Sequence, residues 1–185
     1  MTEEQKYTVV QRFPRFEIRR YEPCVVADVL VTGNFESAGN RGFGPLFGYI
    51  SGSNKPNTKI AMTAPVIQEL KQKISMTAPV MQQVAESGSV ISFVMPAHMT
   101  LDSLPIPNNS EVSLRSIQEQ LVAVKRFSGR WTKESCDKNL NELMSRIADH
   151  GFEQAGPPRF ARFNPPWTPG FMRRNEVQIP VESKI

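Results

Sequence analysis

The chain has few of the residues that hold metals or crosslink small proteins. Only two cysteines and two histidines occur among its 185 residues. Neither a CxxC pair nor a Cys/His cluster is present, which argues against a structural zinc site. The lone thiols of Cys24 and Cys136 are typical of a protein in a reducing compartment. We therefore expect no metal site and no fold that depends on disulfides.

Long apolar segments are lacking as well. The polar start, Met1 to Lys6, has no stretch that resembles a secretory signal. No apolar run approaches the roughly 20 residues that a membrane helix needs. These features predict a cytoplasmic protein without a membrane span. With 39% hydrophobic and 22% charged residues, a chain of this length can bury one full core, so we expect a single domain over residues 1–185.

The positive charge is modest, with a formal net charge of +4. Because no RNP-like pattern, helix-turn-helix or basic helix is present, we do not expect nucleic acid as a partner. The simplest interpretation of the arginine clusters is that they lie on solvated strand faces. The two clusters are Arg12, Arg15, Arg19 and Arg20, and Arg159, Arg162, Arg173 and Arg174.

Two segments have the spacing of apolar residues that is typical of helices. The first covers residues 34–50, with Asn34 as its N-cap. Four glycines weaken this helix and Pro45 is expected to kink it. The second helix begins after Thr132, which can cap it, and ends near Gly151.

A gap-free internal repeat relates the two strand-to-helix passages. Residues 18–33 align on 114–129, so that Gly33 meets Gly129. We interpret each copy as a hairpin that feeds a helix, with the turn of the first copy at Glu22-Pro23. This pattern predicts a tandem duplication with pseudo-two-fold symmetry, in halves of about 7–96 and 111–181.

A shorter repeat is more specific. Residues 59–66 recur as 73–80 with seven of eight positions identical, and both copies contain Met-Thr-Ala-Pro-Val. Their prolines confine these segments to edges, bulges or loops of a sheet. Further strands are predicted at 89–96, 159–163 and 173–181, with an irregular connector at 97–110 and a loop at 164–170.

Several of these motifs together resemble the SOUL/heme-binding family. They are Met-Thr-Ala-Pro-Val at 62–66 and 76–80, Val-Met-Pro at 94–96, Asn-Pro-Pro at 164–166 with Arg-Arg-Asn-Glu-Val at 173–177, and Phe-Glu-Ile-Arg-Arg-Tyr-Glu-Pro at 16–23. The resemblance covers about residues 7–181. It implies an α+β fold, a distorted and twisted antiparallel β-barrel flanked by two helices. It also implies a cytosolic protein that binds heme or another tetrapyrrole as a small-molecule ligand, and we expect a monomer or a weak dimer.

The ligand site implied by the resemblance is an apolar groove beside the helix at 34–50. The glycines of this helix allow a flat macrocycle to approach, and Phe43 and Phe47 can contact its ring. Arg41, or Arg173 with Arg174, can pair with propionates, and methionines suit an adaptable apolar pocket. The competing interpretation places the phenylalanines and methionines in the core and the arginines in solvent. The expected binding residues are Arg41, Phe43, Leu46, Phe47, Ile50, Met62, Met76, Met172, Arg173, Arg174 and Glu176.

Iron coordination is where this sequence departs from the family pattern. Some members are thought to use a histidine in the opening strand as an axial ligand, and Arg20 stands at the matching position. Only His98 and His150 remain, and His150 suits a helix C-terminus for electrostatic reasons alone. We therefore expect that heme binds without a histidine ligand.

Two other functions stay open. The architecture also resembles the gyrase-inhibitor-like ligand-binding domains, in which an acidic residue on a late strand receives lipophilic cations, and Glu176 occupies a comparable place. Alternatively, Glu176 with Tyr7, Tyr21 or Tyr49 could perform acid–base chemistry. No Ser-His-Asp order, metal cluster or phosphate loop supports an enzyme, so no catalytic residue is predicted.

Overall fold

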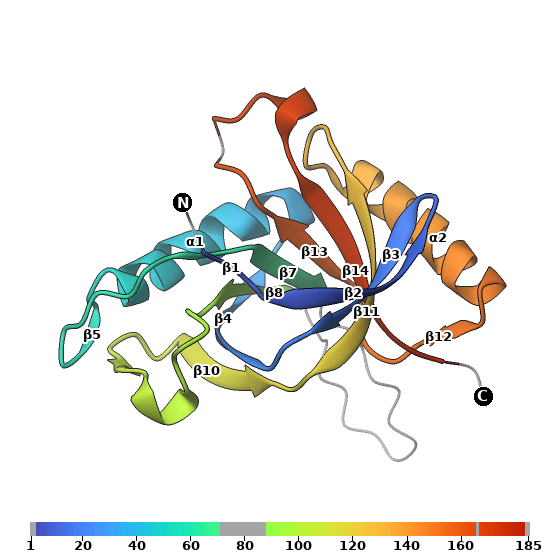
Figure 1. The fold of residues 1–185 in the computed structure, drawn as a ribbon. Helices are drawn as coiled ribbons and strands as arrows, with labels where there is room; N and C mark the ends of the chain where they lie inside the picture. The colour runs from blue at the N-terminus through green and yellow to red at the C-terminus, as the bar shows by residue number, and fades with distance from the viewer. Residues whose placement is uncertain (1–2, 71–87, 166, 184–185) are drawn as a thin grey trace, which may run out of the picture.

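The structure is a computed structural model that describes residues 3–70, 88–165 and 167–183. The two helices are α1 (Phe35–Ile50) and α2 (Lys133–Asp149), and they accompany a large antiparallel sheet (Figure 1). The strands are β1 (Glu3–Glu4), β2 (Tyr7–Phe13), β3 (Phe16–Tyr21), β4 (Cys24–Thr32), β5 (Asn54–Lys55), β6 (Thr63–Ala64), β7 (Val66–Leu70), β8 (Gly88–Val94), β9 (Ile106–Pro107), β10 (Val112–Ile117), β11 (Gln120–Phe127), β12 (Phe152–Gln154), β13 (Arg159–Arg162) and β14 (Asn175–Ser183). Short 3-10 turns lie at Leu101–Ser103 and Gly170–Met172. The α+β class and the two helices are therefore confirmed.

The main sheet has ten strands in the order β10-β4-β8-β7-β13-β14-β11-β3-β2, with β12 attached to β14. Two small pairs, β1 with β6 and β5 with β9, lie outside it. The strands at the two ends, β10 and β2, do not pair with each other in the part of the chain that the structure describes. The sheet is therefore open there, and the predicted closure into a barrel is not confirmed.

The predicted hairpin at Glu22-Pro23 is wrong. β3 pairs with β2 and β11, whereas β4 pairs with β10 and β8, so the two strands diverge after the turn. Proline lacks an N–H and biases the residue before it toward extended backbone, so this dipeptide does not favour a tight reversal. Each strand pairs instead with the counterpart, in the other repeat, of its expected hairpin partner, so that β3 pairs with β11 and β4 with β10.

The pairing register keeps the offset of the internal repeat. Ile18 lies opposite Ala123, and the pair 96 residues away in the alignment, Leu114 opposite Ala27, is also present. The order β10-β4-β8-β7 on one side mirrors β3-β11-β14-β13 on the other. The alignment derived from sequence therefore agrees with how these strands pair.

Local capping places both helices close to the predicted boundaries. Asn34 accepts a hydrogen bond from the Ser37 N–H at 2.9 Å, and Thr132 accepts one from Ser135 at 3.2 Å. Gly42 serves packing, because a Cβ there would lie 2.6 Å from the Ile91 side chain on β8. Its missing side chain lets α1 approach the sheet.

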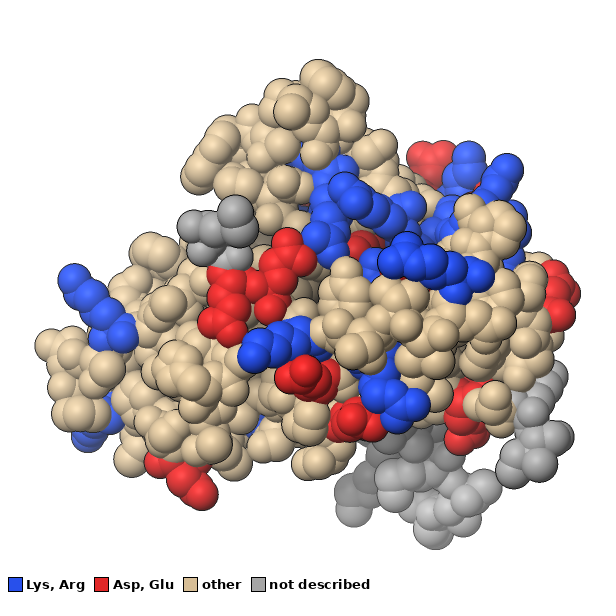
Figure 2. Space-filling model, viewed as in Figure 1, with Lys and Arg blue, Asp and Glu red and all other residues tan. Residues whose placement is uncertain are grey.

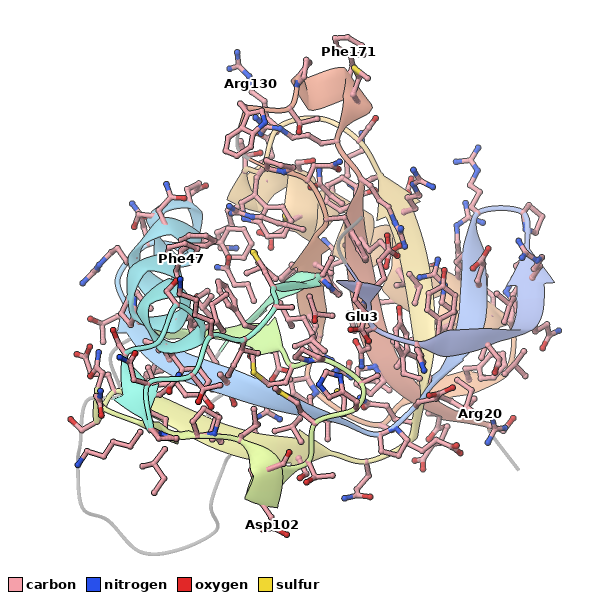
Figure 3. All side chains as sticks on the ribbon, turned by 60° about the vertical axis from the view of Figure 1, so that its left-hand side comes forward. Glu3, Arg20, Phe47, Asp102, Arg130 and Phe171 are labelled. Atoms are coloured by element: carbon pink, nitrogen blue, oxygen red, sulfur yellow. The ribbon has the colours of Figure 1, made fainter. Side chains whose placement is uncertain are left out.

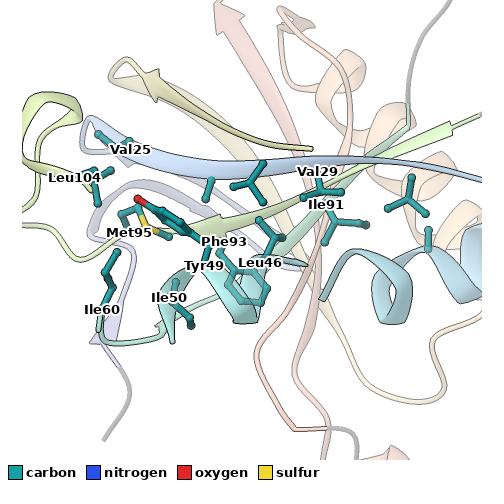
Figure 4. Close-up of a cluster of buried hydrophobic side chains, with 14 residues drawn as sticks. Val25, Val29, Leu46, Tyr49, Ile50, Ile60, Ile91, Phe93, Met95 and Leu104 are labelled. Carbon is teal, nitrogen blue, oxygen red and sulfur yellow. The ribbon is translucent and has the colours of Figure 1, made fainter. Parts of the chain in front are cut away.

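Both helices cover one face of the sheet, which we call the helix face. Ala27, Phe93, Phe160, Val177 and Ala123 are buried on this face, and the register connects them across six strands from β4 to β11. One buried cluster lies beneath α1 (Figure 4) and another beneath α2. The opposite face is more polar and is crossed by the N-terminal residues, as the blue strand β1 shows in Figure 1.

The first copy of Met-Thr-Ala-Pro-Val lies where the shorter repeat predicted. Pro65 interrupts the chain between β6 and β7, so it occupies a break between strands. The second copy, at 76–80, lies outside the described residues together with Met76. Among the described helices, neither has the length and apolar character needed to cross a bilayer.

Candidate functional site

The apolar residues of α1 that the sequence proposed as a binding site fall into a buried pair and an exposed pair, because of their spacing along the helix. Leu46 and Ile50 are buried in the core cluster beneath the helix (Figure 4). Phe43 and Phe47 are 38% and 49% exposed, and their rings stack with centroids 5.5 Å apart. These two residues and Gly39, one turn earlier, lie along one side of α1, which we call the phenylalanine flank. An aromatic pair left this open to solvent is available to a flat ligand.

Arg41 lies on another side of the helix. Its position two residues before Phe43 turns it away from the phenylalanine flank. Its Nη1 donates a hydrogen bond of 2.6 Å to the Thr32 carbonyl at the end of β4. Arg41 therefore ties the start of α1 to the preceding strand, and the structure does not bring it to the exposed phenylalanines.

The predicted methionines fall into two places. Met62 is 37% exposed, and the chain leading to it is anchored to the end of α1 by a 2.8 Å hydrogen bond from the Ile60 N–H to the Ile50 carbonyl. Met172 is strongly exposed beside Phe171 in the segment before β14. Figure 3 shows Phe171 at the tip of this projecting segment and Phe47 on α1. Apolar side chains are thus exposed both along α1 and on the β13–β14 connection.

The two neighbouring arginines just before β14, Arg173 and Arg174, have different partners. The Arg173 Nε donates to the Thr168 carbonyl at 2.7 Å. Arg174 instead forms ion pairs with Glu4 at 2.9 Å and with Glu176 at 3.0 Å. Because two carboxylates already hold the Arg174 guanidinium, a ligand carboxylate would have to compete with them.

Glu176 lies at the centre of a buried polar network on the opposite face. Its side chain is fully buried and accepts hydrogen bonds from Arg19, Arg174 and Gln178 at 3.0–3.2 Å. Burial alone would lower the pKa of Arg19, but the attraction of Glu176 and the contacts with Tyr21 outweigh it and raise that pKa. The negative charge of Glu176 is therefore already paired with the positive charges of Arg19 and Arg174.

This network bears on both alternative functions. A lipophilic cation could reach Glu176 only by displacing two arginines, which counts against the cation-receptor interpretation. The Tyr21 hydroxyl accepts from Arg19 and Gln178, and burial, with the Glu176 charge, raises the Tyr21 pKa. Tyr49 lies elsewhere and donates to the Pro105 carbonyl. In the described residues, Glu176 and Tyr21 thus share Arg19 and Gln178 as hydrogen-bond partners. The carboxylate of this pair is held by arginines, which counts against a role in acid–base chemistry.

The two arginine clusters converge in part on one hollow. A depression of about 520 Å³ lies over the β2–β3 hairpin and β11, next to Arg174, and Figure 2 shows basic side chains gathered there. Several of these arginines already form ion pairs with acidic residues of the chain, as Arg12 does with Glu17 at 3.0 Å. The lining arginines are Arg12, Arg15, Arg19, Arg126 and Arg174.

The histidines do not assemble a metal site. His98 is exposed in the loop after β8, and His150 ends α2 with its Nδ1 2.7 Å from the Arg146 carbonyl. Arg20, at the position matching the family histidine, pairs with Glu119. Within the described ranges, no group of three or more His, Cys, Asp or Glu side chains is arranged to hold a metal.

Sequence reasoning missed two residues beside the phenylalanine flank. Trp131 stacks on Phe35 with centroids 5.8 Å apart, and the Arg162 guanidinium lies 3.9 Å from the centre of the Trp131 ring. The Arg162 guanidinium also touches the position of Gly39, where a Cβ would lie 3.2 Å from its Nη1. The alternation of Phe160 and Arg162 along β13 was the available signal, because residues two apart in a strand share a face.

The fold has counterparts among solved structures. A crystal structure of the EcmrR C-terminal domain matches with a TM-score of 0.67 at 14% identity, covering 96% of this chain and 98% of that one. A crystal structure of a hydrolase from Listeria innocua matches with a TM-score of 0.61 at 9% identity, covering 94% of each chain. At these identities the likeness defines the architecture alone. The protein is thus an α+β protein whose fold also occurs in the EcmrR C-terminal domain and in a hydrolase from Listeria innocua.

Sequence comparison is more specific than fold. The model of the SOUL heme-binding protein family matches residues 2–73 and 68–180. Heme-binding protein 2 of Mus musculus and of Homo sapiens are each 31% identical over 137 residues, which is 74% of this chain. The match spans 63% of the length of those relatives. The chain therefore belongs to the SOUL heme-binding protein family.

Proposed function

We propose that this protein binds heme or a related tetrapyrrole on the phenylalanine flank of α1, as a carrier, buffer or sensor. The observation that carries the proposal is the stacked pair Phe43 and Phe47, whose side chains are 38% and 49% exposed on a helix whose other large apolar side chains are buried. Family membership and the names of the two relatives support the ligand class.

The physical case rests on apolar area. An exposed aromatic pair offers a flat surface on which a macrocycle can stack, and the hydrophobic effect favours covering it. Phe43 is braced from below by Phe93, with centroids 5.3 Å apart, so the upper surface is held by the core. A braced surface loses less conformational freedom when a ligand binds.

Iron is not required for this mode of binding. The histidines lie in the loop after β8 and at the end of α2, where His150 contacts Phe13 and Phe16, rather than on α1. Affinity would come from ring contact and from pairing of the ligand's carboxylates. We therefore expect metal-free protoporphyrin IX to bind about as well as hemin.

Titration of the purified protein with hemin and with protoporphyrin IX tests the proposal, followed by Soret absorption and by quenching of tryptophan fluorescence. Phe47→Ala should weaken both ligands about tenfold, because it removes one face of the stack. Met144→Ala is the matched control, since Met144 is 40% exposed on α2. No binding of either ligand at micromolar concentration, or equal losses in the two variants, would contradict the proposal.

We also propose that the chain forms one domain from duplicated halves, 7–96 and 111–181, acting as a monomer or weak dimer in the cytoplasm. The shared register offset supports duplication, as do Gly33 and Gly129, which precede the two helices with φ of 111° and 110°. Sedimentation analysis of the full chain tests the oligomeric state. A tight dimer at nanomolar concentration would contradict that part.

A further inference from the structure

Arg162 is a partly buried cation that pairs with no carboxylate of the described residues. Its Nη2 is buried and has no hydrogen-bond partner, and no acidic side chain within the described ranges lies at ion-pair distance from it. Burial lowers the pKa of Arg162 to about 10, and the like charge of Arg173 contributes to this. Its contact with the Trp131 ring offsets only part of the cost of removing a guanidinium from water.

A second unpaired donor lies beside it. The indole Nε1 of Trp131 is buried and also lacks an acceptor among the described residues. The Arg162 guanidinium lies 3.9 Å from the centre of that ring, so the two unpaired donors belong to side chains that are in direct contact. Buried donors are nearly always paired in native proteins, so the Arg162 guanidinium calls for an acceptor, and a carboxylate is the acceptor that also balances its charge.

The location connects this grouping to the phenylalanine flank. The Arg162 guanidinium lies against Gly39, which is four residues before Phe43 and eight before Phe47 on the same side of α1. At 1.5 Å per residue, Gly39 and Phe47 are about 12 Å apart along the helix axis. A ring that covers the two phenylalanines would therefore place a peripheral substituent near Arg162.

We propose that Arg162 receives a carboxylate of the ligand whose apolar ring covers Phe43 and Phe47. The inference rests on the proposed function and narrows it to flat apolar molecules that carry a carboxylate at one edge, such as tetrapyrrole carboxylic acids. Arg41 and Arg174, which the sequence suggested for this role, are held by Thr32 and by internal glutamates.

The test compares protoporphyrin IX with its dimethyl ester, which has the same ring but no carboxylate. Both are titrated in one detergent-containing buffer with the full chain, with Arg162→Met and with Arg41→Met as the matched arginine control. The wild type and Arg41→Met should prefer the free acid by about tenfold or more, as expected for a charge-assisted hydrogen bond. Arg162→Met should bind both ligands with the weaker affinity of the ester.

The outcomes separate this inference from the proposed function. If the wild type binds neither porphyrin, the proposed function fails. If it binds both equally, or if Arg162→Met keeps the preference, the role of Arg162 is overturned while the phenylalanine flank stands. Thermal unfolding confirms that each variant is folded, and Arg162→Gln replaces Arg162→Met if the latter does not fold.

Discussion

Replacing Glu176 with glutamine tests whether the buried network is a structural element. The substitution preserves size but removes the negative charge that the Arg19 and Arg174 guanidinium groups share. The side chain of Arg19 is only 7% exposed and retains Glu17 as its remaining acidic partner. The new amide N–H₂ would also point donors at donors. Glu176→Gln should therefore destabilise the fold.

The size of the loss follows from burial. Removing one partner of a buried ion pair costs about 3–5 kcal/mol, because the other charge stays buried without compensation. Arg19 keeps Glu17 as a partner, and the Arg174 side chain is 18% exposed to water. We therefore expect the loss of unfolding free energy for Glu176→Gln at the lower end of this range, about 3 kcal/mol. For a protein of this size, that corresponds to a melting temperature lower by about 6–12 °C.

Urea unfolding, followed by far-ultraviolet circular dichroism, measures the free energy of unfolding. Glu119→Gln is the matched control, because Glu119 pairs with Arg20 while both side chains are about half exposed. Such a surface pair contributes about 0–1 kcal/mol. If Glu176→Gln destabilises the protein no more than Glu119→Gln, the reasoning is refuted. A variant that keeps its stability but loses binding of lipophilic cations would instead favour the cation-receptor function.

Three further predictions concern packing, capping and thiol reactivity. Gly42→Ala should destabilise the fold by about 1–3 kcal/mol in urea unfolding, because its Cβ would meet Ile91. Gly44→Ala should instead stabilise the fold by up to about 1 kcal/mol, because nothing lies within 4 Å of the added Cβ. A change of unfolding free energy with the same sign in both variants would contradict this. Asn34→Ala should cost about 1 kcal/mol by loss of the helix cap, and Asn34→Gly only a few tenths. Burial raises the pKa of Cys136 to about 12, so its thiol stays protonated at pH 8 and should react with a thiol reagent only after denaturation; rapid labelling in the native state would show that the helix opens.

Local chemistry determined much of this protein from sequence alone. Asn34 and Thr132 marked the helix starts, because a side-chain oxygen before an apolar periodic run satisfies free N–H groups. The repeat of residues 18–33 at 114–129 could be detected because the two segments align without gaps. The strand register keeps the same offset. Family motifs indicated the ligand class. Helical periodicity also turns neighbouring residues by about 100° around the axis, which is why Leu46 is buried while Phe47 is exposed.

Only the tertiary structure decided which distant segments meet. No local signal shows that β3 pairs with β11 rather than with β4, because the turn at Glu22-Pro23 does not by itself choose the partner of the strand before it. Likewise, Gly39 and Arg162 are separated by more than a hundred residues, and they meet because α1 covers the face of the sheet to which the Arg162 side chain of β13 points. Which arginine lies beside the exposed phenylalanines is therefore decided by the packing of α1 on the sheet. Which phenylalanines share that side of α1 is decided by the sequence of the helix alone.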